Sequence, residues 1–397
     1  MPRINQVRIR NYKSISQAAV ELPQFCALVG PNGAGKSNFV DVLAFVRDCL
    51  AESVELAFRN RGGIGAVRRR SGGHPTHIGI RLILELSDDQ WADYAFEISA
   101  KPAEHFSVAR ERCVVGTILG DHQEFDVREG EFIKPIPGLR PKVAPDRLAL
   151  FAASATEEFR PVYDVLTSMR FYSIAPDKLK ELQEPDAGEV LRSHGENAAA
   201  VLKRLSREDP SSFERLRRLL SRVVEGIEGV ESVSVGQKDT LQFRQDVGLK
   251  HPWKFQALSM SDGTLRVLGL LLAINQPGSS SLIAIEEPEA TVHPAVADLL
   301  VEVLLDASQE RQILLTTHSP DILDHKSLQD HNIRVVMMEG GRTLIAPVSE
   351  SSRQALREHL YTAGELLRIG ELGGDVRAAE EAGAQLKLFG SVTAPLA

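Results

Sequence analysis

The feature that most constrains this chain is an eight-residue run near its N-terminus, residues 30–37, which read GPNGAGKS. The run fills every fixed position of the G-x-x-x-x-G-K-[ST] phosphate-loop pattern. An apolar run at residues 25–29 precedes it and predicts a buried strand, and a helical pattern at residues 38–46 follows it. A strand, a glycine-rich loop and a helix in this order predict an α/β protein that binds a nucleoside triphosphate.

The residues of this loop have separate expected roles. Its backbone N–H groups turn inward around a polyphosphate, and the next helix points the positive end of its dipole at the same anion. We expect Lys36 to reach the β- and γ-phosphates and act in catalysis, and the Ser37 hydroxyl to ligate Mg²⁺. The expected nucleotide contacts are Asn32, Gly33, Ala34, Gly35, Lys36, Ser37 and Asn38.

Composition narrows the class of protein further. The chain has 397 residues, a formal net charge of −8 and three widely spaced cysteines, with no C-x-x-C pair. A disulfide framework or a zinc site is therefore not expected, and a reducing cytoplasm fits best. The N-terminus lacks a signal-peptide pattern, and the longest strongly apolar stretch, residues 267–274, is far shorter than the roughly 20 residues that cross a bilayer. We expect a cytoplasmic protein with no membrane partner.

Periodicity divides the chain into four predicted segments. Residues 1–145 form the N-terminal part of the nucleotide-binding lobe. They include an antiparallel sheet over residues 77–135, and prolines 135, 137, 141 and 145 mark its end. Residues 146–228 form a helical lobe, residues 229–348 the C-terminal part of the nucleotide-binding lobe, and residues 349–397 a helical tail. No heptad pattern is sustained, so no long coiled coil is expected.

A pair of carboxylates ends a second predicted core strand. Residues 282–287 read LIAIEE. An apolar parallel strand explains the first part but not two adjacent glutamates at its end. Beside a phosphate loop, Glu286 is expected to bind the metal and Glu287 to polarise the attacking water as general base. The alternative is a pair of solvated surface glutamates.

Two further runs carry polar groups to places where parallel sheets bind ligands. Residues 312–319, QILLTTHS, predict a strand that delivers His318 to the ligand-binding edge, where it would contact the γ-phosphate. A structural histidine is the alternative. Residues 258–266, LSMSDGTLR, place a serine and a glycine just before a predicted helix, which makes an anion-binding N-terminus or an ordinary turn.

Taken in order, these motifs resemble ABC-type ATPases of the SMC and RecF kind, and more closely the stand-alone bacterial ATPases related to the OLD family. The resemblance covers roughly residues 3–348 and implies an ABC-type P-loop ATPase head with an antiparallel β subdomain and a helical lobe. It also implies ATP, rather than GTP, together with Mg²⁺. Its carriers are residues 9–15 (IRNYKSI), 30–38, 195–202 (GENAAAVL), 261–264 (SDGT), 286–294 (EEPEATVHP) and 317–320 (THSP).

The resemblance implies a composite site between two heads. Each ATP would lie between the phosphate loop of one head and the signature of the other, where Ser261 and Gly263 bind the γ-phosphate in trans. ATP would then join two copies as a homodimer. The chain departs from transporter-type relatives at Asp262, where they often carry glycine, and at Glu286, where aspartate is commoner. The Q-loop glutamine is not identified; Gln183 is a guess.

The resemblance also bears on biological role. OLD-type nucleases follow the ATPase with a Toprim domain, and the 79 residues after His318 are too few for the end of the lobe and that domain. Asp375, Glu380 and Glu381 are expected to be a solvated helix face, so no nuclease centre is expected in this chain. The chain resembles the ATPase subunits of two-gene anti-phage systems such as Septu or PARIS. It would regulate a separate effector, a nuclease or toxin.

Three alternative functions remain open from the sequence. A RecF-like repair or clamp ATPase would bind DNA through a glycine-rich loop, residues 59–73, that contains Arg59, Arg61, Arg68, Arg69 and Arg70. Loss of DNA affinity with salt would support it, because each phosphate contact releases a counterion. The others are the nucleotide-binding subunit of a transporter and an ATP-locked scaffold that does not hydrolyse ATP.

Overall fold

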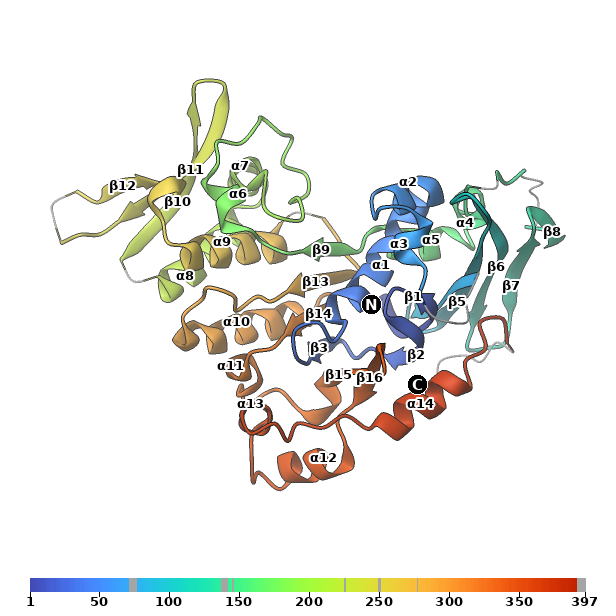
Figure 1. Ribbon diagram of the computed structural model, residues 1–397. Coiled ribbons are helices and arrows are strands. Elements are labelled where there is room, and N and C mark those ends of the chain that lie inside the picture. Colours follow the sequence, from blue (N-terminus) through green and yellow to red (C-terminus); the bar gives the residue numbers. More distant parts are fainter. Residues whose placement is uncertain are drawn as a thin grey trace.

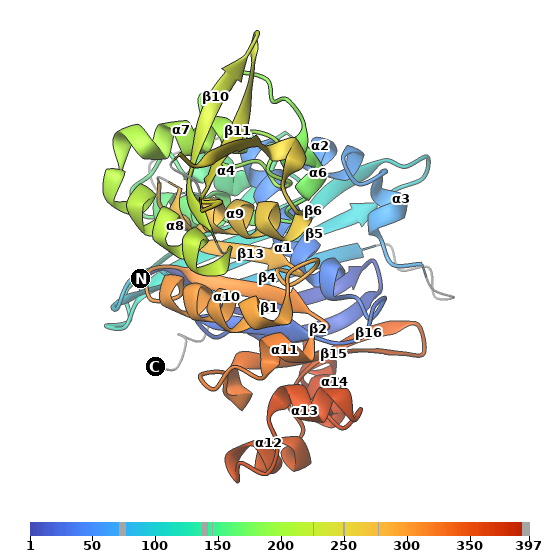
Figure 2. The same cartoon turned by 90° about the vertical axis from the view of Figure 1, so that its left-hand side faces the viewer.

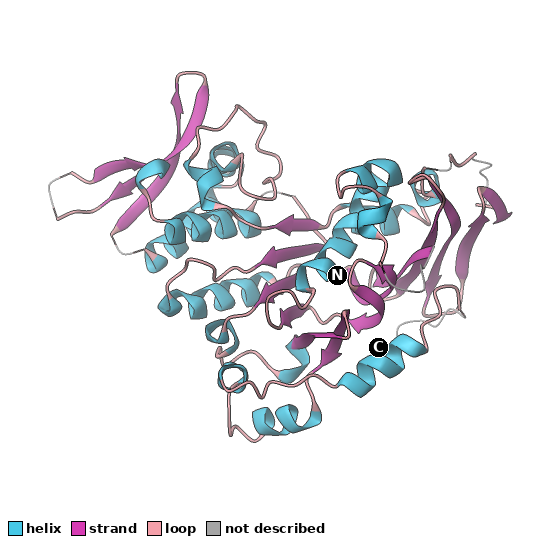
Figure 3. Cartoon of the chain, in the orientation of Figure 1, coloured by secondary structure: helices cyan, strands magenta, loops and turns pink. Residues whose placement is uncertain are grey.

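The computed structural model describes residues 1–70, 77–136, 142–144, 146–224, 226–248, 251–276 and 278–390. These residues form two lobes: one contains the N-terminus and two large sheets, and the other is mainly helical (Figure 1). The prolines at 137, 141 and 145, the end of the glycine-rich loop and the last residues of the tail lie outside the described residues. Figure 3 separates the helices from the strands in the same view.

A six-stranded sheet forms the centre of the molecule, in the order β16-β15-β3-β14-β13-β9. All neighbouring strands are parallel except the edge pair β15 and β16. Strand β3 is buried along its whole length, as expected of a parallel strand covered on both faces. The strands are β3 (Phe25–Val29), β9 (Arg170–Tyr172), β13 (Leu282–Glu286), β14 (Gln312–Thr317), β15 (Ile333–Glu339) and β16 (Arg342–Pro347).

A seven-stranded antiparallel sheet packs beside it, in the order β2-β1-β4-β5-β6-β7-β8. Its second part is the predicted series of hairpins, and its first two strands come from the N-terminus. Buried hydrophobic residues of this sheet pack against helix α1 (Lys36–Ala51). The strands are β1 (Arg3–Tyr12), β2 (Ile15–Glu21), β4 (His77–Glu85), β5 (Gln90–Ala100), β6 (Phe106–Thr117), β7 (His122–Arg128) and β8 (Glu131–Lys134).

The helix after the phosphate loop lies between the two sheets (Figure 1). Helix α1 (Lys36–Ala51) shares one hydrophobic core with strands of both sheets, through residues such as Phe39, Val42 and Phe45. Its chain continues after a short break as α2 (Val54–Arg59), whose first turn is capped by the Ser53 hydroxyl accepting from Leu56 N. The short helices α3 (Ile64–Val67), α4 (Ala149–Ala153) and α5 (Arg160–Thr167) follow.

A second hydrophobic core covers the other face of the central sheet and extends into the helical lobe, which also carries a small sheet, order β10-β11-β12. The longest helix of the described residues is α1, with 16 residues, so the expectation of no long coiled coil agrees with them. The elements are α6 (Pro176–Lys180), α7 (Ala198–Glu208), α8 (Pro210–Val223), β10 (Ile227–Val235), β11 (Lys238–Gln245), β12 (Trp253–Gln256), η1 (Ala257–Ser259), α9 (Asp262–Asn275) and α10 (Pro294–Ala307).

The C-terminal helices extend below the central sheet and return to the antiparallel one (Figures 1 and 2). Leu388 lies against Gly79 of β4, and the buried Arg81 donates to Lys387 O at 2.7 Å. No helix in the described ranges is both long and apolar enough to cross a membrane. The remaining elements are α11 (Pro320–Leu323), η2 (Asp330–Asn332), α12 (Glu350–Arg357), α13 (Ala363–Arg368) and α14 (Val376–Ala384).

Candidate functional site

Three neighbouring parallel strands bring the predicted site residues to one edge of the central sheet. Strand β14 lies between β3 and β13, with Thr317 paired to Val29 on one side and Thr316 paired to Glu286 on the other. The phosphate loop follows Val29, the glutamate pair closes β13, and His318 follows Thr317. The three motifs, far apart in sequence, therefore meet where parallel sheets bind ligands.

Lys36 is buried against the loop that precedes it. Its ammonium donates to Gly30 O at 2.7 Å and to Pro31 O at 3.2 Å, and its residue is only 5% exposed. Burial lowers the pKa of Lys36, while Glu287, Glu289 and Glu286 act in the opposite direction. The loop thus holds a positive charge in place beside three carboxylates, and phosphate oxygens would exchange for its two carbonyl partners.

The turn of the loop requires glycine at two positions. Gly33 and Gly35 have φ values of 79° and 105°, in the left-handed region that favours glycine. Nothing lies within 4 Å of the position that a Cβ on Gly33 would take, whereas a Cβ on Gly35 would lie 2.1 Å from Thr343 Oγ1. Asn32 and Gly33 are exposed and Ala34 is buried. One side of the loop is therefore open, and the other is packed against β16.

A hydrogen-bond network from distant segments supports the loop, and sequence reasoning missed it. Thr343 Oγ1 donates to Ala34 O at 2.8 Å and lies 2.7 Å from Ser14 Oγ. Asn38 Nδ2 donates to the same Ser14 oxygen at 2.6 Å. Asn38 was predicted as a nucleotide contact, but here its amide group bonds within the protein. Ser14 belongs to the quoted run 9–15; nothing in the sequence around Thr343 marks it.

The Ser37 hydroxyl and the first glutamate of the pair form a direct contact. Ser37 Oγ donates to Glu286 Oε2 at 2.6 Å, and Ser37 is exposed while Glu286 is half-buried. One hydroxyl and one carboxylate fit a Mg²⁺ site, because this ion keeps several waters and phosphate oxygens as further ligands. Within the described residues, no three histidine, cysteine or acidic side chains gather to hold a metal alone.

Glu287 and His318 lie opposite one another at the open edge. Glu287 Oε1 is 3.4 Å from His318 Nδ1, and both side chains are about two-fifths exposed. Glu287 has φ 44°, a strained value for a non-glycine residue, and its N–H donates to Thr316 O at 3.0 Å. Strain of this kind gathers at functional sites. The carboxylate that follows this strained turn is partly exposed and faces His318.

Two half-buried side chains, Glu289 and Arg266, lie next to these residues. Glu289 Oε1 accepts from Thr317 Oγ1 at 2.5 Å, while its Oε2 is buried without a hydrogen-bond partner. Burial raises the pKa of Glu289, partly offset by the Thr317 bond. Arg266 of α9 reaches the Glu287 carbonyl at 3.5 Å, and its Nε is also buried and unpartnered. The motif run 286–294 contained Glu289, but its bond to Thr317 appears only in the structure.

The signature residues stand at the start of α9. Ser261 caps α9, its hydroxyl accepting from Thr264 N at 3.2 Å, and Asp262 pairs with Lys180 at 2.5 Å. A Cβ on Gly263 would lie 2.7 Å from Thr291 O, so this glycine is needed for close packing. No hydrogen bond joins Ser261 or Gly263 to residues 30–38, all of which the structure describes. Their role at a nucleotide held by a second copy stays a prediction.

The predicted DNA-binding arginines do not share one free surface. Arg61 is held by Asp41 at 2.8 Å and Asp48 at 2.9 Å with a side chain 10% exposed, so its prediction as a DNA contact is wrong. Arg69 donates to Ser14 O at 2.7 Å and Gly341 O at 3.1 Å, and so fastens two turns together. Arg59 and Arg70 are exposed, and Arg68 is half-buried.

Gln183, the guess for the Q-loop glutamine, is buried in the helical lobe. Its Oε1 accepts from Ala199 N at 2.8 Å, and its backbone pairs with Asp239. This side chain is engaged within the lobe and contacts no residue of the nucleotide edge.

Comparison with known proteins places this arrangement in a family. Residues 25–324, about three-quarters of the chain, match the family described as "AAA domain, putative AbiEii toxin, Type IV TA system". A chromosome partition protein Smc from Methanocaldococcus jannaschii is 43% identical over 47 residues, 12% of this chain and 4% of the relative. Structural maintenance of chromosomes protein 1 from Schizosaccharomyces pombe is 25% identical over 141 residues, 32% of this chain and 11% of the relative. The matches thus span a small part of these relatives' length.

Solved structures support the same fold. An SMC head bound to the C-winged helix domain of ScpA aligns with a TM-score of 0.57 and 13% identity, over 89% of this chain and 99% of that one. An Smc head with an extended coiled coil, bound to the C-terminal domain of ScpA derived from Pyrococcus furiosus, aligns with a TM-score of 0.51 and 13% identity, over 91% and 100%. The predicted ABC-type, SMC-like α/β head is confirmed.

Proposed function

This chain belongs to the AAA-domain family matched by residues 25–324, and we propose on that premise that it is a Mg²⁺-dependent ATPase that closes as a dimer around ATP and regulates a separately encoded effector. The observation that carries the enzymatic part is the shared edge of β3, β14 and β13. There Ser37 contacts Glu286 at 2.6 Å, and Glu287 faces His318 at 3.4 Å. This is the set of groups that phosphoryl transfer to water needs.

Each group has one task in the proposed reaction. Lys36 and the loop amides bind the phosphates, and Ser37 with Glu286 would hold Mg²⁺, which neutralises phosphate charge when bound. Glu287 orients a water molecule and accepts its proton as the water oxygen attacks the γ-phosphorus. The bond from phosphorus to the bridging oxygen then breaks, leaving ADP and inorganic phosphate. His318 donates a hydrogen bond to the γ-phosphate.

The position of the signature supports the proposed composite dimer. Ser261 and Gly263 begin α9, a 14-residue helix whose N-terminus favours an anion. Because these residues make no hydrogen bond to the loop of their own chain, we assign them to the γ-phosphate held by a second copy. ATP then binds the closed dimer more tightly than it binds the separate copies, whereas ADP does not. This difference in affinity between the two states is what a switch requires.

The biological role rests on the family. Its description includes a toxin and a toxin–antitoxin system, which supports a place in defence, as in two-gene anti-phage systems. We propose that the effector, a nuclease or toxin, is a different polypeptide. Asp375 caps α14 by accepting from Ala378 N at 3.0 Å, and Glu381 pairs with Arg377 at 2.8 Å. These tail acids act as ordinary helix-surface residues.

The test is Glu287→Gln, which keeps the shape of the side chain and removes the base. We expect this variant to bind ATP, accumulate as a dimer and hydrolyse ATP at least about 100-fold more slowly, the usual contribution of a general base. Light scattering with ATP or ADP measures the dimer, and phosphate release measures turnover. A rate near that of the wild type would assign the base to another residue.

The effector is tested with the same variant expressed in the native host. A second protein that co-purifies with Glu287→Gln in fixed stoichiometry, and is released by ADP, supports regulation in trans. A homodimer that carries no other protein contradicts the effector part of the proposal while leaving the ATPase part intact.

A further inference from the structure

An ion pair lies within the signature of this chain. Asp262 stands between Ser261 and Gly263, the two residues that we assign to the γ-phosphate held by a second copy. A phosphate group is itself negatively charged, so a free carboxylate beside the residues that bind it would repel it. Lys180 Nζ donates to Asp262 Oδ1 at 2.5 Å. The signature thus contains a negative charge together with the positive charge that cancels it.

The packing of two segments holds this pair together. Lys180 is the last residue of α6, and Leu179 before it is fully buried. Just before α6, Ile174 packs on α9 so closely that a Cβ on Gly269 would lie 2.6 Å from Ile174 Cγ2. Because α6 follows directly from a residue packed against α9, Lys180 is placed beside Asp262 by the fold.

Lys180 supplies the charge that neutralises this carboxylate. The hydrogen bond to Asp262 raises the pKa of Lys180 above its usual value, so the lysine keeps its proton. A second cation, Arg266, lies one turn further along α9. Its Nη1 donates instead to the Glu287 carbonyl at 3.5 Å. The ammonium of Lys180 is therefore the charge bonded directly to the signature.

Folding stability gives little reason for the pair. The side chains of Lys180 and Asp262 are 24% and 48% exposed, and ion pairs this exposed add little to stability. Asp262 is favourable in the first turn of α9 even without a lysine, because the helix dipole attracts a negative charge there. The effect of the pair on the charge of the signature is the better explanation.

This charge matters because the proposed dimer brings negative groups together. Each copy has a net charge of −8, and the triphosphate between two copies adds more. Like charges that face each other across an interface oppose association. The surface that meets the γ-phosphate must therefore not add an uncancelled negative charge.

We propose that Lys180 determines whether the signature accepts a triphosphate. By neutralising Asp262, it allows Ser261 and the backbone amides at the start of α9 to bind the γ-phosphate of a second copy. Lys180 acts through Asp262 and does not itself contact the phosphate, so it is a positioning residue. This proposal rests on the proposed composite dimer and adds to it a residue outside the recognised motifs.

The test measures dimerisation in the presence of ATP by analytical ultracentrifugation. All variants are full-length and carry Glu287→Gln, so that ATP is not consumed. Lys180→Met should weaken dimerisation at least about tenfold, because the charge of Asp262 is then left uncancelled. Adding Asp262→Asn to that variant should restore dimerisation to nearly the parent value. Such a rescue is not expected if Lys180 only supports the fold.

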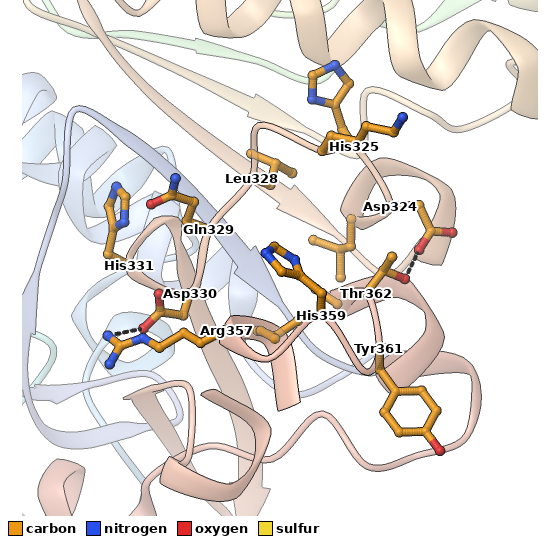
Figure 4. A pocket seen from close by; sticks show the side chains of 14 residues that line it. Asp324, His325, Leu328, Gln329, Asp330, His331, Arg357, His359, Tyr361 and Thr362 are labelled. Carbon is orange, nitrogen blue, oxygen red and sulfur yellow. Dashed lines mark hydrogen bonds and ion pairs between the residues drawn. The ribbon is translucent and has the colours of Figure 1, made fainter. Parts of the chain in front are cut away.

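Two other exposed ion pairs provide matched controls. Lys178, on the same helix as Lys180, pairs with Glu181 at 2.9 Å. Arg357 pairs with Asp330 at 3.1 Å in a pocket among the C-terminal helices (Figure 4). Lys178→Met and Arg357→Met should each leave dimerisation unchanged. Melting temperatures close to that of the parent show that the variants are folded.

Salt provides a second readout. Repulsion between exposed charges is screened over about 10 Å at 0.1 M ionic strength and over about 3 Å at 1 M. The weakening caused by Lys180→Met should therefore shrink as salt is raised between these concentrations. A defect in folding would persist at high salt.

Two results would overturn the proposal. In the first, Lys180→Met dimerises as tightly as the parent. In the second, the double variant is as weak as Lys180→Met alone, which would mean that Lys180 binds the phosphate itself. If the Glu287→Gln parent does not dimerise with ATP, the proposed function fails, and this proposal fails with it. If the parent dimerises and Lys180→Met has no effect, only this proposal fails.

Discussion

At the scale of single residues, the nucleotide edge keeps its charges in place before any ligand arrives. Lys36 is held by two carbonyl oxygens of its own loop, and Glu287 by a strained turn beside Thr316. Both groups are therefore preorganised, and little reordering is needed when phosphates replace the carbonyls of the loop. Two predictions belong to this scale.

Replacing Lys36 with alanine should remove nucleotide binding. The ammonium makes two bonds here, and charge-assisted bonds to phosphate are worth roughly 1.5–3 kcal/mol each, so ATP affinity should fall about 100-fold or more. Titration calorimetry measures the affinity, and an unchanged melting temperature shows that the variant is folded. Retained tight binding would remove the phosphate-loop assignment.

Glu111 should make stability depend on pH. It is fully buried, and burial raises its pKa to about 7, although Ala149 N, Leu150 N and the Tyr94 hydroxyl donate to it. Because the folded pKa is above the unfolded value, its contribution is fully present below about pH 4.5 and is lost as pH rises through about 7.

Between these pH values the free energy of unfolding should therefore fall by up to about 3 kcal/mol from this group. Urea titrations at several pH values check this. Glu111→Gln should flatten the dependence between pH 5 and 8, and an unchanged slope would show that another group is responsible.

At the scale of elements, segments distant in sequence hold the phosphate loop in place by hydrogen bonds. Strand β16 supplies Thr343, and the turn between β1 and β2 supplies Ser14. Thr343→Val removes the hydroxyl and leaves Ala34 O without this donor. We expect the dissociation constant for ATP to rise about tenfold, because an unmet buried group costs roughly 1–3 kcal/mol. Thr343→Ser keeps the hydroxyl and is the matched control, which should bind ATP nearly as the wild type does.

The sequence predicted the site residues that belong to local motifs. It did not predict contacts that form only when the fold brings distant segments together. The phosphate loop, Glu286, Glu287 and His318 were placed by strand patterns that each end in polar residues, and the structure brings them to one edge. Arg61 was misjudged because it lies in a turn and its partners, Asp41 and Asp48, lie on helix α1. Thr343 carries no local signal, since its role exists only once β16 lies beside the loop.

At the scale of the whole molecule, the question is whether one copy completes the site of another. Lys36→Ala and Ser261→Glu should each abolish hydrolysis. An equal mixture should recover activity, because a mixed dimer has one site with an intact loop and an intact signature. If the sites act independently, the recovery is about a quarter of the wild-type rate.

The matched control mixes Lys36→Ala with Glu287→Gln. These residues serve the same loop-side half of the site, so every mixed site retains one defect and no activity should return. Phosphate release measures both mixtures. Recovery in neither would show that signature and loop do not meet across two copies, and equal recovery in both would contradict the assignment of Glu287.

The packing of Thr343 against Gly35 also sets an order of events during protein synthesis. The phosphate loop leaves the ribosome early, but the strand that supports it is made some 300 residues later. At about 5–20 residues per second, the loop waits roughly 15–60 s for its support. A nascent chain therefore exposes the phosphate loop long before β16 packs against it and completes its support.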